Sequence, residues 1–212
     1  MIVSNKYKFI TIDIPKTGTR TIRQTLDNAK AADHIITGID RHAGVSRAMN
    51  LVSDMKMNWD NYTKVCIVRN PWERYVSFLN YMKDCVKNYN KDKSNMLEGM
   101  IRQCKLFMQF TCLSDYEALK KIIQNQPTQS SYYENKDGKC LVDMFARTES
   151  LDSDIDTIFG KLGITVPLVK IKGNIGSYER NYFQYYNNNL MDLVHFKENK
   201  LINKFNFIAP SA

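Results

Sequence analysis

Two apolar segments, each followed by a polar turn and then by a helical pattern, dominate the arrangement of hydrophobic and polar positions. Residues 8–14 (KFITIDI) alternate loosely, are rich in Ile and Thr, and end at a proline, as is typical of a buried strand. Residues 19–32 then carry apolar side chains at helical spacing. The same order returns in residues 64–69 (KVCIVR) and in a predicted helix over 72–86, which follows a proline. The chain therefore predicts two consecutive strand–loop–helix units.

The rest of the chain is mostly helical in pattern. Asp137-Gly138 is a hairpin turn signal, and the segments on either side of it, 129–133 and 139–145, are predicted to be its strands. A lysine- and asparagine-rich stretch, 87–95, is predicted to be a loop. Apolar spacing predicts further helices over residues 45–55, 96–110, 116–124, 151–162 and 182–201.

Apolar strands that alternate with helices favour an α/β fold, in which helices flank a mostly parallel central sheet. The chain has 212 residues, which suits one domain over residues 1–212. Hydrophobic residues make up 43% and charged residues 25%, so the fibrous and disordered classes are excluded. We therefore expect a single P-loop-like α/β domain.

The chain shows no pattern for membrane insertion or export. Its first residues lack a basic leader followed by a long apolar run, and no segment reaches the roughly 20 apolar residues of a membrane span. The five cysteines are odd in number and show no C-x-x-C spacing, which favours buried free thiols over disulfides. We therefore expect a soluble, cytoplasmic protein without a membrane span.

The formal net charge of +8 favours a partner that bears phosphate or sulfate groups. Nucleic acid bears phosphates too, but the lysines and arginines are scattered, and no zinc-finger or RNP-like pattern accompanies them. No cluster of His, Cys or carboxylate residues has the spacing of metal ligands. We therefore expect an anionic ligand, and neither nucleic acid nor a metal.

The first strand-to-helix junction, residues 14–21 (IPKTGTRT), has the composition of a phosphate-binding loop. A helix begins here, and its free backbone N–H groups and positive end attract anions. Lys16 adds a mobile charge, and Gly18 lets the backbone approach a ligand closely. Because the lysine precedes the glycine, this is not a Walker A motif, and a capped helix with a turn glycine is the alternative. Hydroxyl donors in the loop are Thr17, Thr19 and Thr21.

The second junction, VRNPWERYVS, places a further cation near another helix start. Arg69 ends the strand, and Ser77 follows two helical turns on. A guanidinium and a hydroxyl in these places suit a second phosphate. Taken singly, Arg69 as a surface ion-pair partner and Ser77 as a solvated helix residue are the simpler interpretations. Two such junctions in order favour a ligand with two phosphates.

These motifs resemble those of the sulfotransferases that use 3'-phosphoadenosine-5'-phosphosulfate (PAPS), specifically the carbohydrate-sulfotransferase-like group. Residues 129–151 are similar to the family's Q-S…D-G…V-D-F-x-x-R-x-E-x-L stretch, so the likeness covers most of residues 8–165. Around residues 171–178 it weakens, and only Tyr178 matches well. The resemblance implies that the first loop holds the 5'-phosphosulfate, that the second holds the 3'-phosphate, and that no metal takes part.

The resemblance also implies in-line transfer of the sulfuryl group, with 3',5'-adenosine bisphosphate as the second product. Lys16 is the predicted cation at the leaving phosphate. His42 lies between the two junctions and just before a helix, and it is the predicted general base because histidine titrates near neutral pH. A loop histidine that caps this helix is the alternative. The residues implied for PAPS binding are Lys16, Thr17, Gly18, Thr19, Arg20, Thr21, Arg69 and Ser77.

The other titratable groups have simpler explanations. His195 is predicted to pack at the edge of a helix, and His34 to lie on the surface. Glu73 and Glu149 are reserve bases, but ion pairs with nearby arginines explain them more simply. A nucleotide kinase-like phosphotransferase and a non-catalytic module that binds nucleotides or polyanions are the alternative functions. No motif identifies the acceptor, which we expect to be a small molecule or a glycan.

Overall fold

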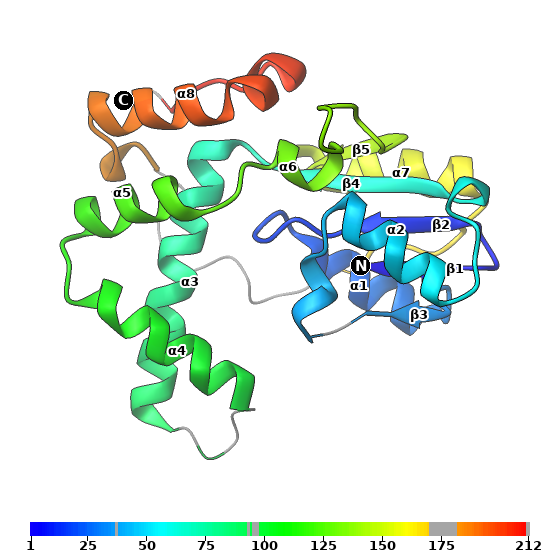
Figure 1. Ribbon diagram of the computed structural model, residues 1–212, viewed down its shortest axis with the longest axis horizontal. Helices are drawn as coiled ribbons and strands as arrows, with labels where there is room; N and C mark the ends of the chain where they lie inside the picture. Colours follow the sequence, from blue (N-terminus) through cyan, green and yellow to red (C-terminus); the bar gives the residue numbers. More distant parts are fainter. Residues whose placement is uncertain (37, 93, 95–97, 170–181, 211–212) are drawn as a thin grey trace. The chain divides into compact units, whose positions relative to one another are not determined.

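The computed structural model describes residues 1–36, 38–92, 94, 98–169 and 182–210 (Figure 1). The chain divides into two compact units. The first comprises Met1–Asn70 and Thr128–Lys172 and holds the sheet. The second comprises Pro71–Pro127 and Gly173–Ala212, and its described residues form helices and their connections. Each unit therefore joins segments that are far apart in the sequence.

A five-stranded sheet forms the centre of the described part of the first unit. Its strands are β1 (Ile2–Ser4), β2 (Phe9–Ile12), β3 (His34–Ile35), β4 (Thr63–Val68) and β5 (Met144–Arg147). In the strand order β3-β1-β2-β4-β5, the β2–β4 and β4–β5 pairs are parallel, whereas β1 is antiparallel to both of its neighbours. Only β1 thus runs in the reverse direction, and the predicted α/β class with a mostly parallel sheet is confirmed.

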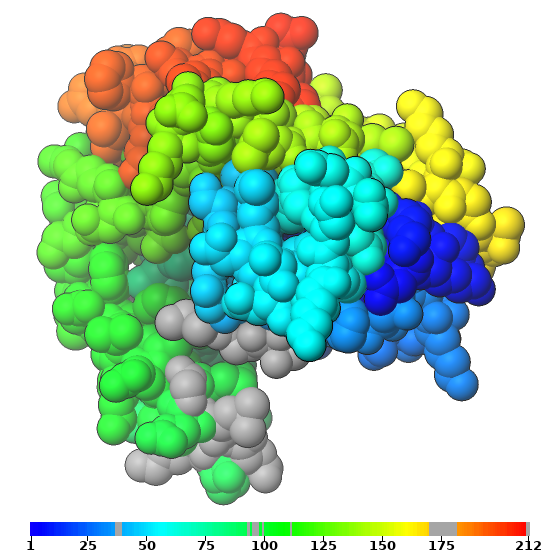
Figure 2. Space-filling model, turned by 45° about the vertical axis from the view of Figure 1, so that its right-hand side comes forward, coloured from blue at the N-terminus to red at the C-terminus, as the bar shows by residue number. Residues whose placement is uncertain are grey.

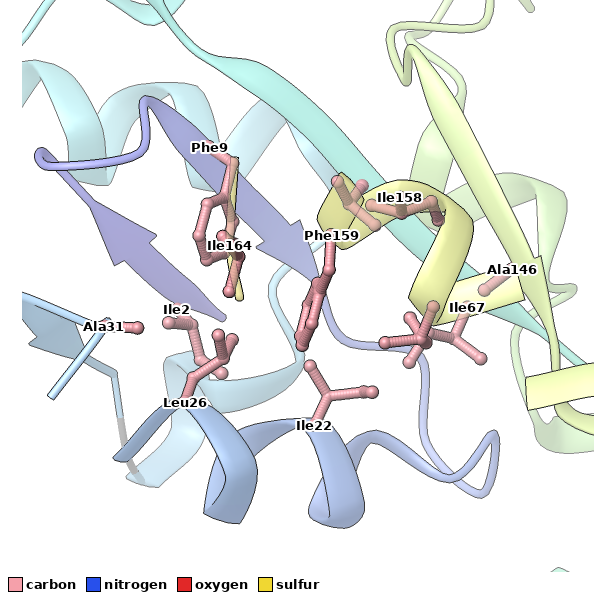
Figure 3. Packing of buried hydrophobic residues seen from close by; sticks show 12 residues of the cluster. Ile2, Phe9, Ile22, Leu26, Ala31, Ile67, Ala146, Ile158, Phe159 and Ile164 are labelled. Carbon is pink, nitrogen blue, oxygen red and sulfur yellow. The ribbon is translucent and has the colours of Figure 1, made fainter. Parts of the chain in front are cut away.

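One face of the sheet carries the main hydrophobic core of this unit, shown in Figure 3. Ile22 and Leu26 of α1 (Thr19–Asn28) and Phe159 of α7 (Leu151–Leu162) pack together against the strands. Burial of each such side chain contributes about 1.5–3 kcal/mol. The core therefore fixes α1, and with it the loop that precedes α1, against the sheet.

The opposite face of the sheet is covered as well. Ile10 and Ile12 alternate with Phe9 along β2 and point away from that core, yet they are buried. In Figure 1, α2 (Val45–Asp54) lies in front of the sheet and α7 lies behind it. The first unit is therefore layered as helix, sheet and helix, as its alternating pattern predicts.

The second unit is built on α3 (Pro71–Lys91), α4 (Glu98–Thr111), α5 (Asp115–Asn125) and α8 (Asn188–Phe205). The proline at the start of α3 suits the first helical position, where its fixed φ helps and its missing N–H costs nothing. A buried ion pair joins α3 to α8, with Arg74 Nη1 3.4 Å from Glu198 Oε1. Glu198 also departs from helical geometry (φ −106°, ψ 18°), so the pair coincides with a kink in α8.

The predicted hairpin is only partly correct. Its turn exists, because Gly138 N donates to Asn135 O at 3.0 Å and a single bridge joins Glu134 to Cys140. Its first predicted strand, 129–133, is instead the short helix α6 (Ser130–Tyr133). In its second predicted strand, 139–145, strand structure begins only at β5 (Met144–Arg147). β5 pairs with β4 and not with residues 129–133. Sheet pairing over a long sequence distance has overridden the local turn signal.

Two predictions about the helical regions also need correction. The loop predicted over 87–95 starts later, because α3 continues to Lys91. The described cysteines are free thiols, as predicted, but they are not all buried, since Cys112 is exposed just after α4.

None of the described helices has the length and apolar character that crossing a membrane requires.

Candidate active site

Three connections start at one edge of the sheet. β2, β4 and β5 are parallel neighbours, with Ile12 opposite Cys66 and Val68 opposite Arg147. Their carboxyl ends therefore lie at the same edge, where the β2–α1 loop, the β4–α3 connection and the residues after β5 begin. In open α/β sheets this edge is the usual place for a ligand site.

The β2–α1 loop has the backbone shape of an anion site. Gly18 is the N-cap of α1 and has a left-handed conformation (φ 82°), and Lys16 also has a positive φ of 69°. Thr17 is fully buried and donates its hydroxyl to Ile14 O at 2.9 Å, which closes the turn. No side chain caps the start of α1, and its first turn contains no acidic residue. The first N–H groups and the positive end of α1 therefore suit an anion.

The side chains predicted to bind an anion differ in exposure along this loop. Lys16 is half-buried, Thr19 is buried, Arg20 is exposed and Thr21 is half-buried. The loop thus combines one cation of limited exposure with one that faces solvent, both next to the positive end of a helix. These charges add to the attraction of the site for phosphate or sulfate.

Thr148, directly after β5, joins the ends of two neighbouring strands. Its Oγ1 lies 3.0 Å from Thr17 O and 3.0 Å from Val68 O, so one hydroxyl proton is shared between two carbonyls. A Cβ at Gly18 would lie 3.4 Å from Leu151 Cδ2, so the loop also packs against the start of α7. These contacts hold the β2–α1 loop against the ends of β4 and β5.

At the end of β4, side chains bind the backbone of Arg69 and Asn70. The fully buried Gln129 accepts from Arg69 N at 3.0 Å and donates to Arg69 O at 2.7 Å. Glu149 Oε1 accepts from Asn70 N at 2.6 Å, whereas the sequence predicted an ion pair with an arginine. Arg69 Nη1 donates to Lys16 O at 3.3 Å. The guanidinium of Arg69 therefore lies beside the β2–α1 loop.

His42 ends the 3-10 helix η1 (Gly38–His42), which precedes α2. Its Nδ1 lies 2.7 Å from Asp13 O, and because a carbonyl oxygen can only accept, Nδ1 carries the proton. Nε2 of the neutral ring is then the basic nitrogen. Burial lowers the pKa of His42; the hydrogen bond to Asp13 opposes this shift, and the neighbouring Arg41 adds to it. The ring is therefore neutral at neutral pH.

The helix-cap alternative for His42 is wrong. The N-cap of α2 is Gly44, and no side chain makes a hydrogen bond at this cap. A Cβ at Gly44 would lie 3.3 Å from Ser131 O, so the start of α2 packs closely against α6. Figure 2 shows α2, in cyan, beside the yellow-green residues around α6. This close packing fixes the chain directly after His42.

Asp13 is a residue of the site that the sequence analysis did not single out. Its buried carboxylate accepts from Thr11 Oγ1 at 2.7 Å, from Arg23 Nη2 at 2.8 Å and from the amino group of Met1 at 2.8 Å. Burial raises the pKa of this carboxyl, but the three donors lower it more, so the group is ionised. An acidic residue within the apolar strand pattern KFITIDI is the signal that marks it.

The remaining predicted residues lie elsewhere. Ser77 belongs to the second unit, where it is buried in α3 with 7% of its surface exposed. His34 is exposed on β3, as predicted, and His195 is exposed on α8, where a packed position was predicted. The stretch 171–178, including Tyr178, lies outside the described residues. Within the described ranges, no group of three or more His, Cys, Asp or Glu residues is arranged to hold a metal ion.

The chain was compared with known protein families, with curated proteins and with solved structures. The model of the sulfotransferase family matches residues 1–204. This range includes the β2–α1 loop, His42 and the β4–α3 junction, and it extends over residues of both units. No curated protein and no solved structure matches the chain.

Proposed function

The chain belongs to the sulfotransferase family, and from this premise we propose that it transfers a sulfuryl group from PAPS to a hydroxyl or an amine of an acceptor. The acceptor is a small molecule or a glycan. One observation carries the proposal: the β2–α1 loop combines Lys16 and the uncapped start of α1 with the Asp13 carbonyl that orients His42. A cation, an anion site and a base thus belong to one connected part of the first unit.

The donor is bound through its two phosphate ends. The 5'-phosphosulfate binds the loop from Lys16 to Thr21, where Thr17 acts through its backbone N–H because its hydroxyl is used inside the loop. Gly18 admits the close approach, and Thr19, Arg20 and Thr21 add donors from the first turn of α1. The 3'-phosphate is bound by Arg69 of the first unit. Ser77, which the second motif also predicts for this phosphate, belongs to the second unit and stays a prediction.

The reaction is an in-line displacement at sulfur. A new bond forms between the acceptor oxygen or nitrogen and sulfur while the bond from sulfur to the bridging oxygen of the 5'-phosphate breaks. Lys16 stabilises the negative charge that grows on that oxygen, and His42 Nε2 takes the proton of the acceptor. The second product is 3',5'-adenosine bisphosphate. Lys16, Arg20 and the start of α1 supply the positive charge, so the proposed chemistry needs no metal.

The proposal extends to the setting of the enzyme. Free cysteine thiols suit a reducing compartment, so we place the protein in the cytoplasm. The positive charge serves the bisphosphate donor and an acceptor, and nucleic acid is not part of the proposed function.

Calorimetric titration with 3',5'-adenosine bisphosphate, without metal, tests the donor site. We expect the wild type to prefer the bisphosphate over ATP. Lys16→Ala and Arg69→Ala should bind it about 10-fold to 100-fold more weakly, because each removes a charge-assisted hydrogen bond of about 1.5–3 kcal/mol. The matched control is Lys30→Ala, since Lys30 also has a positive φ (50°) but is exposed just after α1. Failure of the wild type to bind the bisphosphate, or equal binding of ATP that needs magnesium, would favour the kinase-like or the polyanion-binding alternative.

Turnover then separates an enzyme from a non-catalytic binding module. Purified protein is incubated with PAPS and a panel of hydroxyl and amine acceptors, and formation of the bisphosphate is followed. We expect acceptor-dependent release of the bisphosphate. Tight binding of the bisphosphate without any turnover of PAPS would favour the binding module.

A further inference from the structure

Arg23 has no part in the proposed reaction, yet it joins two segments that place His42. It projects from the second turn of α1, and only 14% of its side chain is exposed. Its Nη2 donates to Asp13 Oδ2 at 2.8 Å, and its Nη1 donates to Ile36 O at 3.1 Å. Asp13 follows β2, whereas Ile36 lies between β3 and the 3-10 helix η1 that ends at His42. One guanidinium therefore connects the residue that His42 contacts with the segment that leads to His42.

The tautomer of His42 depends on a single acceptor, the carbonyl oxygen of Asp13. Its 2.7 Å contact keeps the proton on Nδ1 and leaves the lone pair on Nε2. The direction of this carbonyl follows the backbone of Asp13, and the side chain of the same residue is held by Arg23 and Thr11. A change in how the carboxylate is held therefore changes the acceptor that His42 meets.

We propose that Arg23 is a positioning residue for His42, and that its two hydrogen bonds select the ring tautomer with a basic Nε2. The inference rests on the proposed function, in which Nε2 takes the acceptor proton. Arginine suits this role because its planar guanidinium donates in two fixed directions, whereas a lysine ammonium acts as a single compact charge. Arg23 acts only through Asp13 and the backbone at Ile36.

Two variants of Arg23 separate the effect of its hydrogen-bond geometry on His42 from the effect of its charge. The charged groups that act on His42 are the Asp13 carboxylate, Arg41 and the amino group of Met1, and Arg23 is bound to the first of these. Arg23→Lys keeps a positive charge at this position but has one donor nitrogen in place of the separate Nη1 and Nη2, whereas Arg23→Gln loses the charge as well as the second donor nitrogen.

A matched control removes the guanidinium of an arginine that is close to His42 in the sequence but makes a different contact. Arg47 pairs with Asp40 on the surface, with Nε 3.0 Å from Oδ1 and 52% of the arginine side chain exposed. Arg47→Gln therefore changes the net charge in the same way as Arg23→Gln while leaving the contacts of Asp13 and Ile36 intact.

NMR of protein carrying isotope-labelled histidine reports the tautomer directly, and the chain has only three histidines to assign. We expect His42 to carry its proton on Nδ1 in the wild type and in Arg47→Gln. In both Arg23 variants this preference should fall about tenfold, the factor that one hydrogen bond contributes. An unchanged tautomer in both variants, or a change in Arg23→Gln alone, would overturn the proposal. Urea unfolding identifies the folded variants, and Arg23→Lys, the milder change, suffices if Arg23→Gln does not fold.

Titration of the same samples with 3',5'-adenosine bisphosphate distinguishes this inference from the proposed function. If the Arg23 variants bind the bisphosphate and their His42 tautomer is unchanged, the positioning role is overturned and the proposed function stands. A changed tautomer in a protein that does not bind the bisphosphate would overturn the proposed function and leave the positioning role standing.

Discussion

The two strand–loop–helix junctions are alike in sequence order, but they differ in whether side chains form hydrogen bonds with their backbone. At the β2–α1 junction the chain turns through Lys16 and Gly18, both with positive φ, and no side chain caps the helix. At the β4–α3 junction the amide groups of Arg69 and Asn70 are already bound by two side chains. The first junction therefore offers its backbone to a ligand, and the second offers side chains.

This difference suits the two ends of the proposed donor. Backbone N–H groups at a helix start fix a phosphate precisely, as in-line transfer requires of the 5'-phosphosulfate. In the proposed reaction the 3'-phosphate takes no part in the bond changes, so a guanidinium on a well-held backbone would suffice to bind it. Gln129 holds the backbone from which the Arg69 side chain extends, so the second junction is also preorganised, though by different means.

The largest expected effect comes from adding a side chain to the first junction. Gly18→Ala forces a Cβ into a left-handed position 3.4 Å from Leu151 Cδ2, whereas Gly163→Ala has the same kind of backbone (φ 70°) and nothing within 4 Å. Both variants should lose about 1–2 kcal/mol of unfolding free energy. Only Gly18→Ala should also lose affinity for the bisphosphate, by about 10-fold to 100-fold. Calorimetry and urea unfolding measure the two effects, and equal affinity in both variants would remove the special role of the first junction.

An intermediate effect is expected at the second junction. Gln129→Ala leaves both Arg69 N and Arg69 O without their buried partner, which should lower the unfolding free energy by about 1–3 kcal/mol. Glu149→Gln keeps an acceptor for Asn70 N and should cost less than about 1 kcal/mol. Urea unfolding of the two variants gives the comparison. Equal losses would mean that the backbone of the second junction does not depend on Gln129 in particular.

The smallest expected effect is a pH dependence of stability that arises at His42, which contacts Asp13 directly before the first junction. Burial lowers the pKa of His42, so the folded protein takes up this proton at a lower pH than the unfolded chain, whose histidine titrates near 6.5. The stability contributed by neutral His42 is present above that pH and is lost as the pH falls through the folded pKa. His42→Gln should therefore lose less unfolding free energy than the wild type between about pH 7 and about pH 5. The exposed His195→Gln is the control, and a loss in His42→Gln equal to that of the wild type would contradict the shift.

Elements with a strong local pattern were predicted closely. α7 occupies residues 151–162 and α1 starts at Thr19, both as predicted, because helical periodicity extends over several turns there. β1 and β3 were not predicted, since they have three and two residues, too few to show a period. Their hydrogen bonds come from neighbouring strands in the sheet, which the local sequence does not encode.

In the site, too, features encoded by the local sequence were predicted and features that depend on distant residues were not. Lys16 and Arg69 were each assigned to a junction, and the structure brings them together, because each follows a strand of a parallel sheet. Gln129 and Thr148 were not assigned roles, since their partners are backbone atoms of residues far away in the sequence. Asp13 was visible as an acid in an apolar strand, but its link to His42 runs through a carbonyl oxygen that every residue possesses.

The reversed direction of β1 has a consequence for the order of folding. Ile2 pairs with Thr11 in a local hairpin, whereas Phe9 pairs with Thr63 across a long stretch of chain. The hairpin closes a short loop and can form early, but the parallel pairs must wait for longer loops to close at a greater entropic cost. The carboxyl edge of β2, β4 and β5 is complete only after that slow step. The bisphosphate, if it binds at this edge as proposed, would recognise the finished sheet and not its hairpin precursor, so ligand concentration alone should raise the resistance of the protein to unfolding.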